Sequence, residues 1–248
     1  MDITYKHYHE VNKTNKSTIY FRIYHQNVRG LGMKACELLS HLHPDFPYVL
    51  CLTEHHLKYS QMNNVYIENY NLGAYYCREL CEKGGVAIFA HNSLCFSNID
   101  IVKHCEEQDI VICALKLSFG ILNICVLILY RAPSGNFSCF LFMLDTTHQL
   151  LYTPTYCGDI NINYLMESEK KNQLDNLLLS CNLTNIINFP TRVQNTSATA
   201  IDNIFIDVSE FERSTATPIL NGLSDHDAQL LVISTDYSHI PIYLYQEK

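Results

Sequence analysis

The sequence predicts a layered α/β (α+β) domain in which two β-sheets pack together and helices lie outside them. Apolar runs rich in β-branched and aromatic residues outnumber the segments in which apolar residues have helical spacing. Several neighbouring runs are separated by turn residues that are typical of hairpins. No repeat, low-complexity block or Gly/Ser/Pro linker divides the chain. Packed sheets with helices outside are the layer arrangement that fits this pattern.

Several apolar segments have the length and composition of strands. They cover residues 19–28, 48–53, 86–90, 110–117, 121–130, 201–206 and 229–233. Gly84-Gly85 predicts a turn into the segment that begins at Val86, because glycine tolerates the backbone angles of tight turns. Phe119-Gly120 separates two of the runs and predicts a hairpin.

Three segments have the apolar spacing of helices. The first covers residues 33–42 and is ended by Pro44, which cannot continue a helix. The second covers residues 138–151, and the third covers residues 168–179. The apolar side of the third helix consists of Leu174, Leu177 and Leu178.

Both ends of the chain differ in composition from this domain. Residues 1–17 are polar and rich in Lys, Asn and His, and we expect them to form a flexible N-terminal arm. The domain itself is expected to cover residues 18–236. Residues 237–248 would then form a C-terminal tail.

The composition excludes several classes of protein. With 48% hydrophobic and 17% charged residues, the chain is globular and not intrinsically disordered. A net charge of −8 argues against a general basic coat for nucleic acid, although an enzyme with carboxylates around a metal could still act on it. The eleven cysteines show no zinc-site spacing, and we expect reduced thiols.

The apolar segments also bear on location. The polar start does not have the pattern of a secretion signal, and the run at residues 121–130 is far shorter than the ~20 residues of a spanning helix. We therefore expect an intracellular protein, nuclear or cytoplasmic and not secreted, that acts as a monomer away from membranes.

Polar clusters lie at the edges of five apolar runs, and converging strand ends could form one phosphodiester-cleaving metal site. Glu54 follows the strand at 48–53, where a carboxylate can hold a hard cation such as Mg²⁺. Asn27 ends the first strand and offers a neutral oxygen. Taken alone, Glu54 could equally be an exposed loop residue, and Asn27 could cap a turn with Gly30.

Asp159 and Asn161 are two positions apart, so on an extended segment their side chains point to the same side. Asp159 could accept a proton from water while Asn161 orients the water or a phosphate oxygen. An Asx turn is the alternative interpretation, since both residue types favour turns.

Asp202 lies within an apolar strand, where a carboxylate is costly unless it has a partner. His226 is the natural partner, because a carboxylate–imidazole pair fixes the tautomer and stabilises the imidazolium. A surface histidine in an acidic loop is the alternative. We expect ordinary roles for the other histidines, including His55 and His56.

Tyr130 and Arg131 end the strand at 121–130, where a hydroxyl and a guanidinium could meet a phosphate. An ordinary amphipathic strand end would leave the same residues there. The residues alone do not decide between these two interpretations.

With its motifs in order, the chain resembles the endonuclease/exonuclease/phosphatase superfamily, and within it the apurinic-type endonuclease domain of LINE (non-LTR) retrotransposons. The matching segments are QNVRGL (26–31), LTEHHL (52–57), GGVAIF (84–89), YRAPSG (130–135), GDININ (158–163), FPTR (189–192), IDNIF (201–205) and SDHDAQL (224–230). One such motif is weak, whereas eight in order are specific.

The resemblance implies a four-layer sandwich of two packed, mainly antiparallel β-sheets flanked by helices. It implies Mg²⁺, with Mn²⁺ as a possible substitute, bound by Glu54 with help from Asn27, and Asp225 supporting this acidic metal site. Asp159 would activate the nucleophilic water, with Asn161 beside it.

The resemblance also implies how the phosphate is held. Asp202 would orient His226, which would contact the phosphate. The remaining phosphate-binding residues would be Tyr130, Thr191 and Ser224. Apart from the resemblance, the few basic residues of the chain that we expect to contact phosphate are Arg131, Arg192 and Arg29.

Some positions depart from the family pattern. The family often has Trp where Gln26 and His55 stand, and Phe where Ile160 stands. Residues 152–157 read YTPTYC, where an apolar strand is expected before Asp159. The sequence therefore leaves the setting of Asp159 open.

Three functions compete. The first is a Mg²⁺-dependent DNA endonuclease that nicks one strand and leaves a 3′-hydroxyl. The second is a phosphatase of the same superfamily that acts on an inositol phosphate or a lipid headgroup, and the third is a catalytically decayed remnant. Tyr130 favours the nuclease, because other branches of the superfamily tend to have a second histidine in that region.

Overall fold

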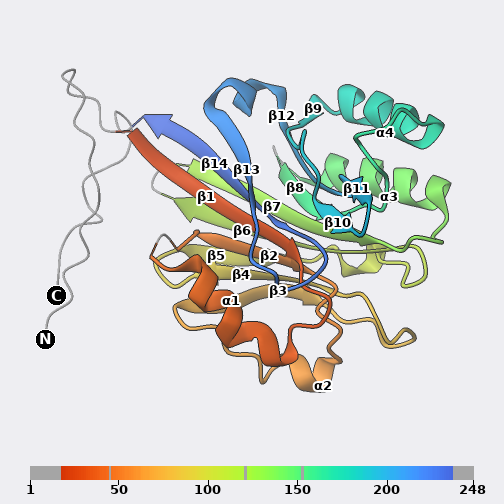
Figure 1. The fold of residues 1–248 in the computed structure, drawn as a ribbon. Coiled ribbons are helices and arrows are strands. Elements are labelled where there is room, and N and C mark those ends of the chain that lie inside the picture. The colour runs from red at the N-terminus through yellow and green to blue at the C-terminus, as the bar shows by residue number, and fades with distance from the viewer. Residues whose placement is uncertain (1–17, 45, 120–121, 152–153, 237–248) are drawn as a thin grey trace, which may run out of the picture.

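The chain forms two β-sheets that pack face to face, with helices on the outer face of each, in a computed structural model (Figure 1). The structure describes residues 18–44, 46–119, 122–151 and 154–236. The predicted arm and tail, residues 1–17 and 237–248, lie outside the described residues.

The first sheet contains the beginning and the end of the described chain. Its strand order is β13 (Ser214–Ile219), β14 (Ala228–Asp236), β1 (Thr18–Asn27), β2 (Val49–Thr53), β4 (Val86–His91) and β3 (Tyr70–Tyr76). β1 and β2 are parallel, and every other neighbouring pair is antiparallel.

The second sheet is built from the middle of the chain. Its strand order is β5 (Cys95–Ile99), β6 (Ile110–Phe119), β7 (Leu122–Arg131), β8 (Pro154–Asp159), β12 (Asp202–Asp207) and β9 (Leu183–Asn185). Here β7 and β8 are the parallel pair, and the other neighbours are antiparallel. A small separate sheet pairs β10 (Arg192–Gln194) with β11 (Ser197–Thr199).

Helices complete the outer layers. The α-helices are α1 (Ala35–Leu42), α2 (Tyr59–Met62), α3 (Phe137–Leu150) and α4 (Glu169–Ser180), and the short 3-10 helices are η1 (Gly32–Lys34), η2 (Val102–His104) and η3 (Val208–Arg213). Residues of α1 and α2 are buried against the first sheet, and residues of α3 and α4 against the second. Among the described residues, no helix combines the length and the apolar character needed to cross a membrane.

The main core lies between the two sheets, where alternate residues of the strands meet. Ile23 and Ile88 enter it from the first sheet, and Ile128 and Ile204 from the second. The intervening residues are apolar too, because helices cover both outer faces. The predicted four-layer arrangement with mainly antiparallel sheets is confirmed.

The predicted strands and helices are present within a few residues of the expected bounds. β6 and β7 pair from Ile110↔Arg131 to Phe119↔Leu122 as the predicted hairpin, whose tip at residues 120–121 lies outside the described part. The strands that the pattern did not predict are β3, β5, β8, β9, β10, β11 and β13.

The segment before Asp159, whose setting the sequence left open, forms a strand. Residues 154–159 form the central strand β8, and all six are buried although several are polar. The hydroxyl of buried Tyr156 lies 3.1 Å from Nδ1 of His148 on α3, which gives it a polar partner. Gly158 lets β8 approach β7 closely, because a Cβ there would lie 2.1 Å from the carbonyl oxygen of Leu129.

The topology brings polar strand ends together. In the parallel pairs, Asn27 lies opposite Thr53 and Tyr130 lies opposite Asp159, so both pairs end at the same edge of the sandwich. The antiparallel strand β12 begins at this edge, where Asp202 pairs with Asp159. The ends of β1, β2, β7, β8 and β12 therefore surround one site.

Candidate active site

Asn27 and Asp159 connect the two sheets at this edge. The Asn27 amide Nδ2 donates a hydrogen bond of 2.8 Å to Oδ2 of Asp159, and both side chains are buried. The Asn27 Oδ1 accepts from the backbone N–H of Arg29 at 3.1 Å. Asn27 is therefore held at both ends of its amide, directly beside the carboxylate predicted to activate water.

Asp202 and His226 form a buried pair. Nδ1 of His226 lies 2.7 Å from Oδ2 of Asp202. The Thr191 hydroxyl donates to the same Asp202 oxygen at 2.9 Å and accepts from the backbone N–H of Asp202 at 3.1 Å. With Nδ1 bound to Asp202, Nε2 is the nitrogen of His226 that can donate to a substrate oxygen.

The electrostatics of these groups are coupled. Burial, together with the nearby charges of Asp202 and Glu54, raises the pKa of Asp159 well above its usual range. Burial alone would lower the pKa of His226, but the charge and hydrogen bond of Asp202 outweigh it and raise the pKa. His226 is thus stabilised as imidazolium, beside a carboxylate that resists ionisation when no further positive charge is near.

Glu54 lies at the end of β2 with a backbone φ of +53°. Its N–H donates to the carbonyl of Gly85 at 2.8 Å, which ties it to the turn before β4. Burial alone would raise the pKa of Glu54, but hydrogen bonds from His56 and Asn27 lower it. Nε2 of His56 lies 3.1 Å from Oε2 of Glu54, a contact that the sequence did not predict.

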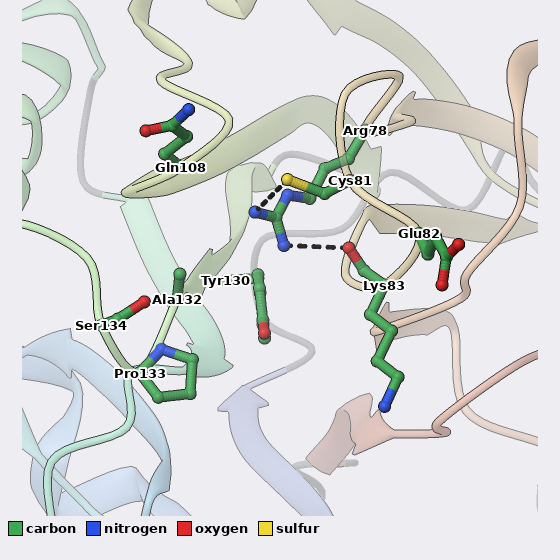
Figure 2. A pocket seen from close by; sticks show the side chains of 9 residues that line it. All are labelled: Arg78, Cys81, Glu82, Lys83, Gln108, Tyr130, Ala132, Pro133 and Ser134. Atoms are coloured by element: carbon green, nitrogen blue, oxygen red, sulfur yellow. Dashed lines mark hydrogen bonds between the residues drawn. The ribbon is translucent and has the colours of Figure 1, made fainter.

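Tyr130 is the last residue but one of β7 and is buried beside Glu54. Burial, and then the charges of Glu54 and Asp159, raise the pKa of its hydroxyl, which stays protonated. The Arg78 guanidinium lies over its ring, 5.7 Å from the ring centre, and donates to the carbonyl of Lys83 at 2.9 Å. Figure 2 shows Tyr130 between Arg78 and Pro133 in the wall of an open cavity of about 570 Å³.

Asn161 completes the loop after β8. Its backbone N–H donates to Oδ1 of Asp159 at 3.1 Å, which is the Asx-turn contact that the sequence left open. Its Nδ2 donates to the carbonyl of Arg131 at 2.8 Å. Asn161 therefore lies beside Asp159 and also anchors the loop to β7.

Three residues predicted to contact the phosphate, Thr191, Ser224 and Arg131, make hydrogen bonds within the protein. The Thr191 hydroxyl is engaged with Asp202, and the Ser224 hydroxyl donates to the carbonyl of Asn27 at 2.6 Å. Arg131 is almost fully buried, and its guanidinium donates to the carbonyls of Ile160 and Gly135 at 3.3 and 2.9 Å. Burial leaves the Arg131 guanidinium out of reach of an incoming phosphate, so that expectation is corrected.

Asp225 pairs with two arginines. Nη1 of Arg29 lies 2.6 Å from one Asp225 oxygen, and Nε of Arg192 lies 2.8 Å from the other. Burial alone would raise the pKa of Asp225, but the two arginines lower it to about 2. Both oxygens are thus neutralised by guanidinium groups, which argues against Asp225 as a direct metal ligand. The sequence did not predict that Arg29 pairs with Asp225, although both arginines were expected near the phosphate.

The buried group of Asp159, Asp202 and His226 could hold a metal ion, because one ligand atom from each lies within 4.8 Å of the others. Oδ1 of Asp202 is buried and has no hydrogen-bond partner among the described residues, so this oxygen is available as a ligand atom. However, an imidazolium is not a ligand, and Mg²⁺ prefers oxygen. The carboxylates of Asp159 and Glu54, on either side of Asn27, suit a hard cation better.

Comparison with known proteins shows the class to which this fold belongs. No protein-family model matches the sequence, and no curated protein matches it. The endonuclease domain of TRAS1, a telomere-specific non-LTR retrotransposon, is a solved structure with a TM-score of 0.69 and 13% identity, covering 86% of this chain and 98% of that domain.

Two further structures have the same fold. An AP endonuclease from Leishmania major has a TM-score of 0.62 at 12% identity, covering 87% of this chain and 88% of its own. The 3′ phosphatase NExo from Neisseria, bound to a product DNA hairpin, has a TM-score of 0.63 at 15% identity, covering 86% of this chain and 99% of its own.

These likenesses define the fold. The chain has the fold of the endonuclease/exonuclease/phosphatase superfamily, as its motifs predicted, and a LINE endonuclease domain is among the structures it resembles. At 12–15% identity, the similarity to these structures supports the fold alone, and the activity must be inferred from the residues of the site.

Proposed function

We propose that this chain is a Mg²⁺-dependent phosphodiester hydrolase that nicks one strand of DNA and leaves a 3′-hydroxyl. One observation carries the proposal: Asp159, the Asp202–His226 pair and Glu54, which are far apart in sequence, meet at one edge of the sandwich. Asp202 is hydrogen-bonded to His226, Asp159 is hydrogen-bonded to Asn27, and the Tyr130 hydroxyl lies beside Glu54.

A divalent cation fits the charge of this site. Asp159, Asp202 and Glu54 bring three carboxylates close together, and the nearest positive partner of the buried two is His226. Glu54 would hold Mg²⁺ or Mn²⁺ with Asn27 beside it, and Asp159 would lie next to the cation. When bound, the cation would neutralise charge that develops on the phosphate.

The protein's own groups would then divide the chemistry. Asp159 would accept the proton of a water molecule that attacks phosphorus, and Asn161 would orient that water. His226 would donate from Nε2 to a phosphate oxygen, and Tyr130 would donate from its hydroxyl. The bond from the water oxygen to phosphorus would form as the bond from phosphorus to O3′ breaks, and the 3′ oxygen would take a proton from solvent and leave as a hydroxyl. Such acid–base groups typically contribute about 10²–10⁴-fold.

DNA is the proposed partner because two partly exposed arginines, Arg29 and Arg192, flank the site. Guanidinium groups suit phosphate oxygens, which they can contact in pairs. Tyr130 stands where a second histidine would favour other branches of the superfamily. The predicted intracellular location and monomeric state stay predictions.

The test is nicking of supercoiled plasmid with Mg²⁺ or with EDTA, in parallel with release of phosphate from an inositol phosphate. We expect open-circular product with Mg²⁺ only, and nicks that a DNA polymerase extends without pretreatment, which reports a 3′-hydroxyl. Phosphate release without nicking would favour the phosphatase. No turnover of either substrate by a folded protein that binds Mn²⁺ would favour the decayed remnant.

A further inference from the structure

Gln26 lies one residue before the end of β1, on the face of the first sheet opposite to Asn27. Side chains alternate along a strand, so Tyr24 and Gln26 point to the outer face, where Tyr24 packs in the core under α1. Asn27 points between the sheets and contacts Asp159. Gln26 is fully buried, so any effect that it has on the reaction must pass through the residues that it holds.

The amide of Gln26 donates to the main chain of His226. Its Nε2 lies 2.9 Å from the carbonyl oxygen of His226 and 2.9 Å from Oδ1 of Asn221. The Ser224 hydroxyl lies 3.1 Å from the same carbonyl, but a hydroxyl has one proton and its shorter contact, 2.6 Å, is with the carbonyl of Asn27. Among the described residues, Gln26 is therefore the main donor to the carbonyl of His226.

Tyr24 and Asn221 fix the orientation of this amide. The Tyr24 hydroxyl donates to Oε1 of Gln26 at 2.5 Å, and Nδ2 of Asn221 lies 3.0 Å from the same oxygen and 2.9 Å from the Tyr24 oxygen. Burial raises the pKa of Tyr24 more than the hydrogen bond of Asn221 lowers it, so the hydroxyl keeps its proton. A reversed amide would bring Oε1 against two acceptors, the His226 carbonyl and Oδ1 of Asn221.

His226 lies where the two sheets meet, which makes the position of its main chain important. Two residues after it, β14 begins at Ala228 in the first sheet, whereas its imidazole contacts Asp202 at the start of β12 in the second. A shift of the His226 main chain relative to β1 would change both the contact with Asp202 and the direction of Nε2. A misplacement of about 1 Å can cost about 10²-fold in rate.

We propose that Gln26, oriented by Tyr24 and Asn221, is a positioning residue for His226. Its hydrogen bond to the His226 carbonyl sets the main chain so that the imidazole keeps its contact with Asp202 and turns Nε2 toward the substrate phosphate. The role of Nε2 rests on the proposed function, whereas the placement of the imidazole does not.

The test is Gln26→Met, which keeps the length of the side chain and removes its donors and its acceptor. Long-range ¹H–¹⁵N NMR at fixed pH observes Nδ1 and Nε2 of His226 separately, and His226→Gln identifies their signals. In Gln26→Met the Nδ1 signal should shift, and kcat for nicking should fall by about 10²-fold with KM little changed. The Mg²⁺ dependence of the rate should stay as in wild type, because Asn27 lies on the other face of β1.

Thr147→Val is the matched control for a lost buried hydrogen bond. Thr147 is buried on α3, outside the second sheet, and its hydroxyl donates to the carbonyl of Met143 at 2.8 Å. This variant should lower the melting temperature and leave the His226 signals and kcat unchanged. Tyr24→Phe should shift the Nδ1 signal less than Gln26→Met does, because Asn221 still donates to Oε1.

Unchanged His226 signals in a folded Gln26→Met would overturn the inference. If that variant does not fold, unchanged signals in Tyr24→Phe would do so. A loss of activity with an altered Mg²⁺ dependence would also overturn it, because the effect would then pass through Asn27. Wild type that does not nick DNA, with a shifted Nδ1 signal in Gln26→Met, would remove the proposed function and leave the positioning of His226 standing. Nicking by wild type with unmoved signals in the variant would do the reverse.

Discussion

Two carboxylate–cation clusters lie on the same site and differ in burial. In the Asp202–His226 cluster the two atoms are 2.7 Å apart, and the side chains are 0% and 3% exposed. In the Arg29–Asp225–Arg192 cluster the contacts are 2.6 and 2.8 Å, and the side chains of Arg29, Asp225 and Arg192 are 41%, 21% and 29% exposed. The contact distances are alike, so the difference in surroundings decides what each cluster does.

Burial makes the first cluster an all-or-none unit. A charge left without its partner in a dry site is costly, so Asp202, His226 and Thr191 depend on one another. Water screens the second cluster, so its contacts contribute little to folding while its guanidinium groups stay available. The buried cluster can therefore hold a proton on His226, and the exposed cluster can bind a charged ligand.

The largest expected effect comes from breaking the buried cluster. Asp202→Ala should remove the partner of His226 and destabilise the fold by about 3–5 kcal/mol, as loss of one member of a buried pair does. Urea unfolding measures the free energy of unfolding. The nicking rate should fall by about 10²–10⁴-fold, the usual contribution of an acid–base group.

A double-variant cycle separates a unit from two independent residues. Asp202→Ala, His226→Ala and the double variant should lose activity to similar extents, because effects within one catalytic unit are strongly non-additive. Asp202→Asn keeps the shape and so controls for packing. Losses that multiply in the double variant would return Asp202 to a purely structural role.

Glu54 lies 4.0 Å from Arg29 of the exposed cluster, and its removal should act through the cation. Glu54→Ala should lower kcat/KM by about 10²-fold, the scale of one lost electrostatic contact, and added Mg²⁺ should restore part of it. The matched control is Glu212→Ala in η3, which should leave the Mg²⁺ dependence unchanged. Equal activity of Glu54→Ala and wild type at every Mg²⁺ concentration would show that Glu54 is not a ligand.

The same contrast explains how much of the fold the sequence could predict. Strands with continuous apolar runs, such as β2 and β7, were predicted because both of their faces are buried. β8 was not, since its burial depends on partners supplied by the fold, such as His148 for the hydroxyl of Tyr156. β3 begins and ends with tyrosine and lies at the edge of its sheet, where periodicity is a weak signal.

The site divides in a similar way. The Asp202–His226 contact was predictable, because a carboxylate inside an apolar strand demands a partner and the motifs limit the choice. The Arg29–Asp225 contact was not, because exposed charges make no such demand and are 196 positions apart. The burial of Arg131 could not be predicted either. Its polar partners are main-chain carbonyls, which every sequence provides and which therefore give no signal in the sequence.

Titration of Asp225 tests the exposed cluster. The pKa of Asp225 should measure about 2 against an ordinary 3.8, by NMR of its carboxyl carbon. Because the folded value is depressed, the contribution to stability is present above pH 3.8 and is lost as the pH falls towards 2. Arg29→Ala should move the pKa of Asp225 back towards 3.8, with little change in stability at neutral pH. If the pKa of Asp225 is unchanged in Arg29→Ala, the contact between Arg29 and Asp225 is absent in solution.

The smallest effect is expected in DNA binding. Only 17 Lys and Arg residues offset 25 acidic ones, and among the predicted arginine contacts Arg29 and Arg192 remain once buried Arg131 is set aside. The logarithm of the binding constant should fall with the logarithm of the salt concentration with a shallow slope, about 0.9 for each neutralised phosphate. Arg29→Ala and Arg192→Ala should each reduce the slope by about one contact or less, since Asp225 already neutralises part of both charges. Arg213→Ala, away from the site, should leave it unchanged. A slope above roughly 8 would require a basic surface that the two arginines cannot provide, and the exposed cluster would then be a minor part of the DNA contact.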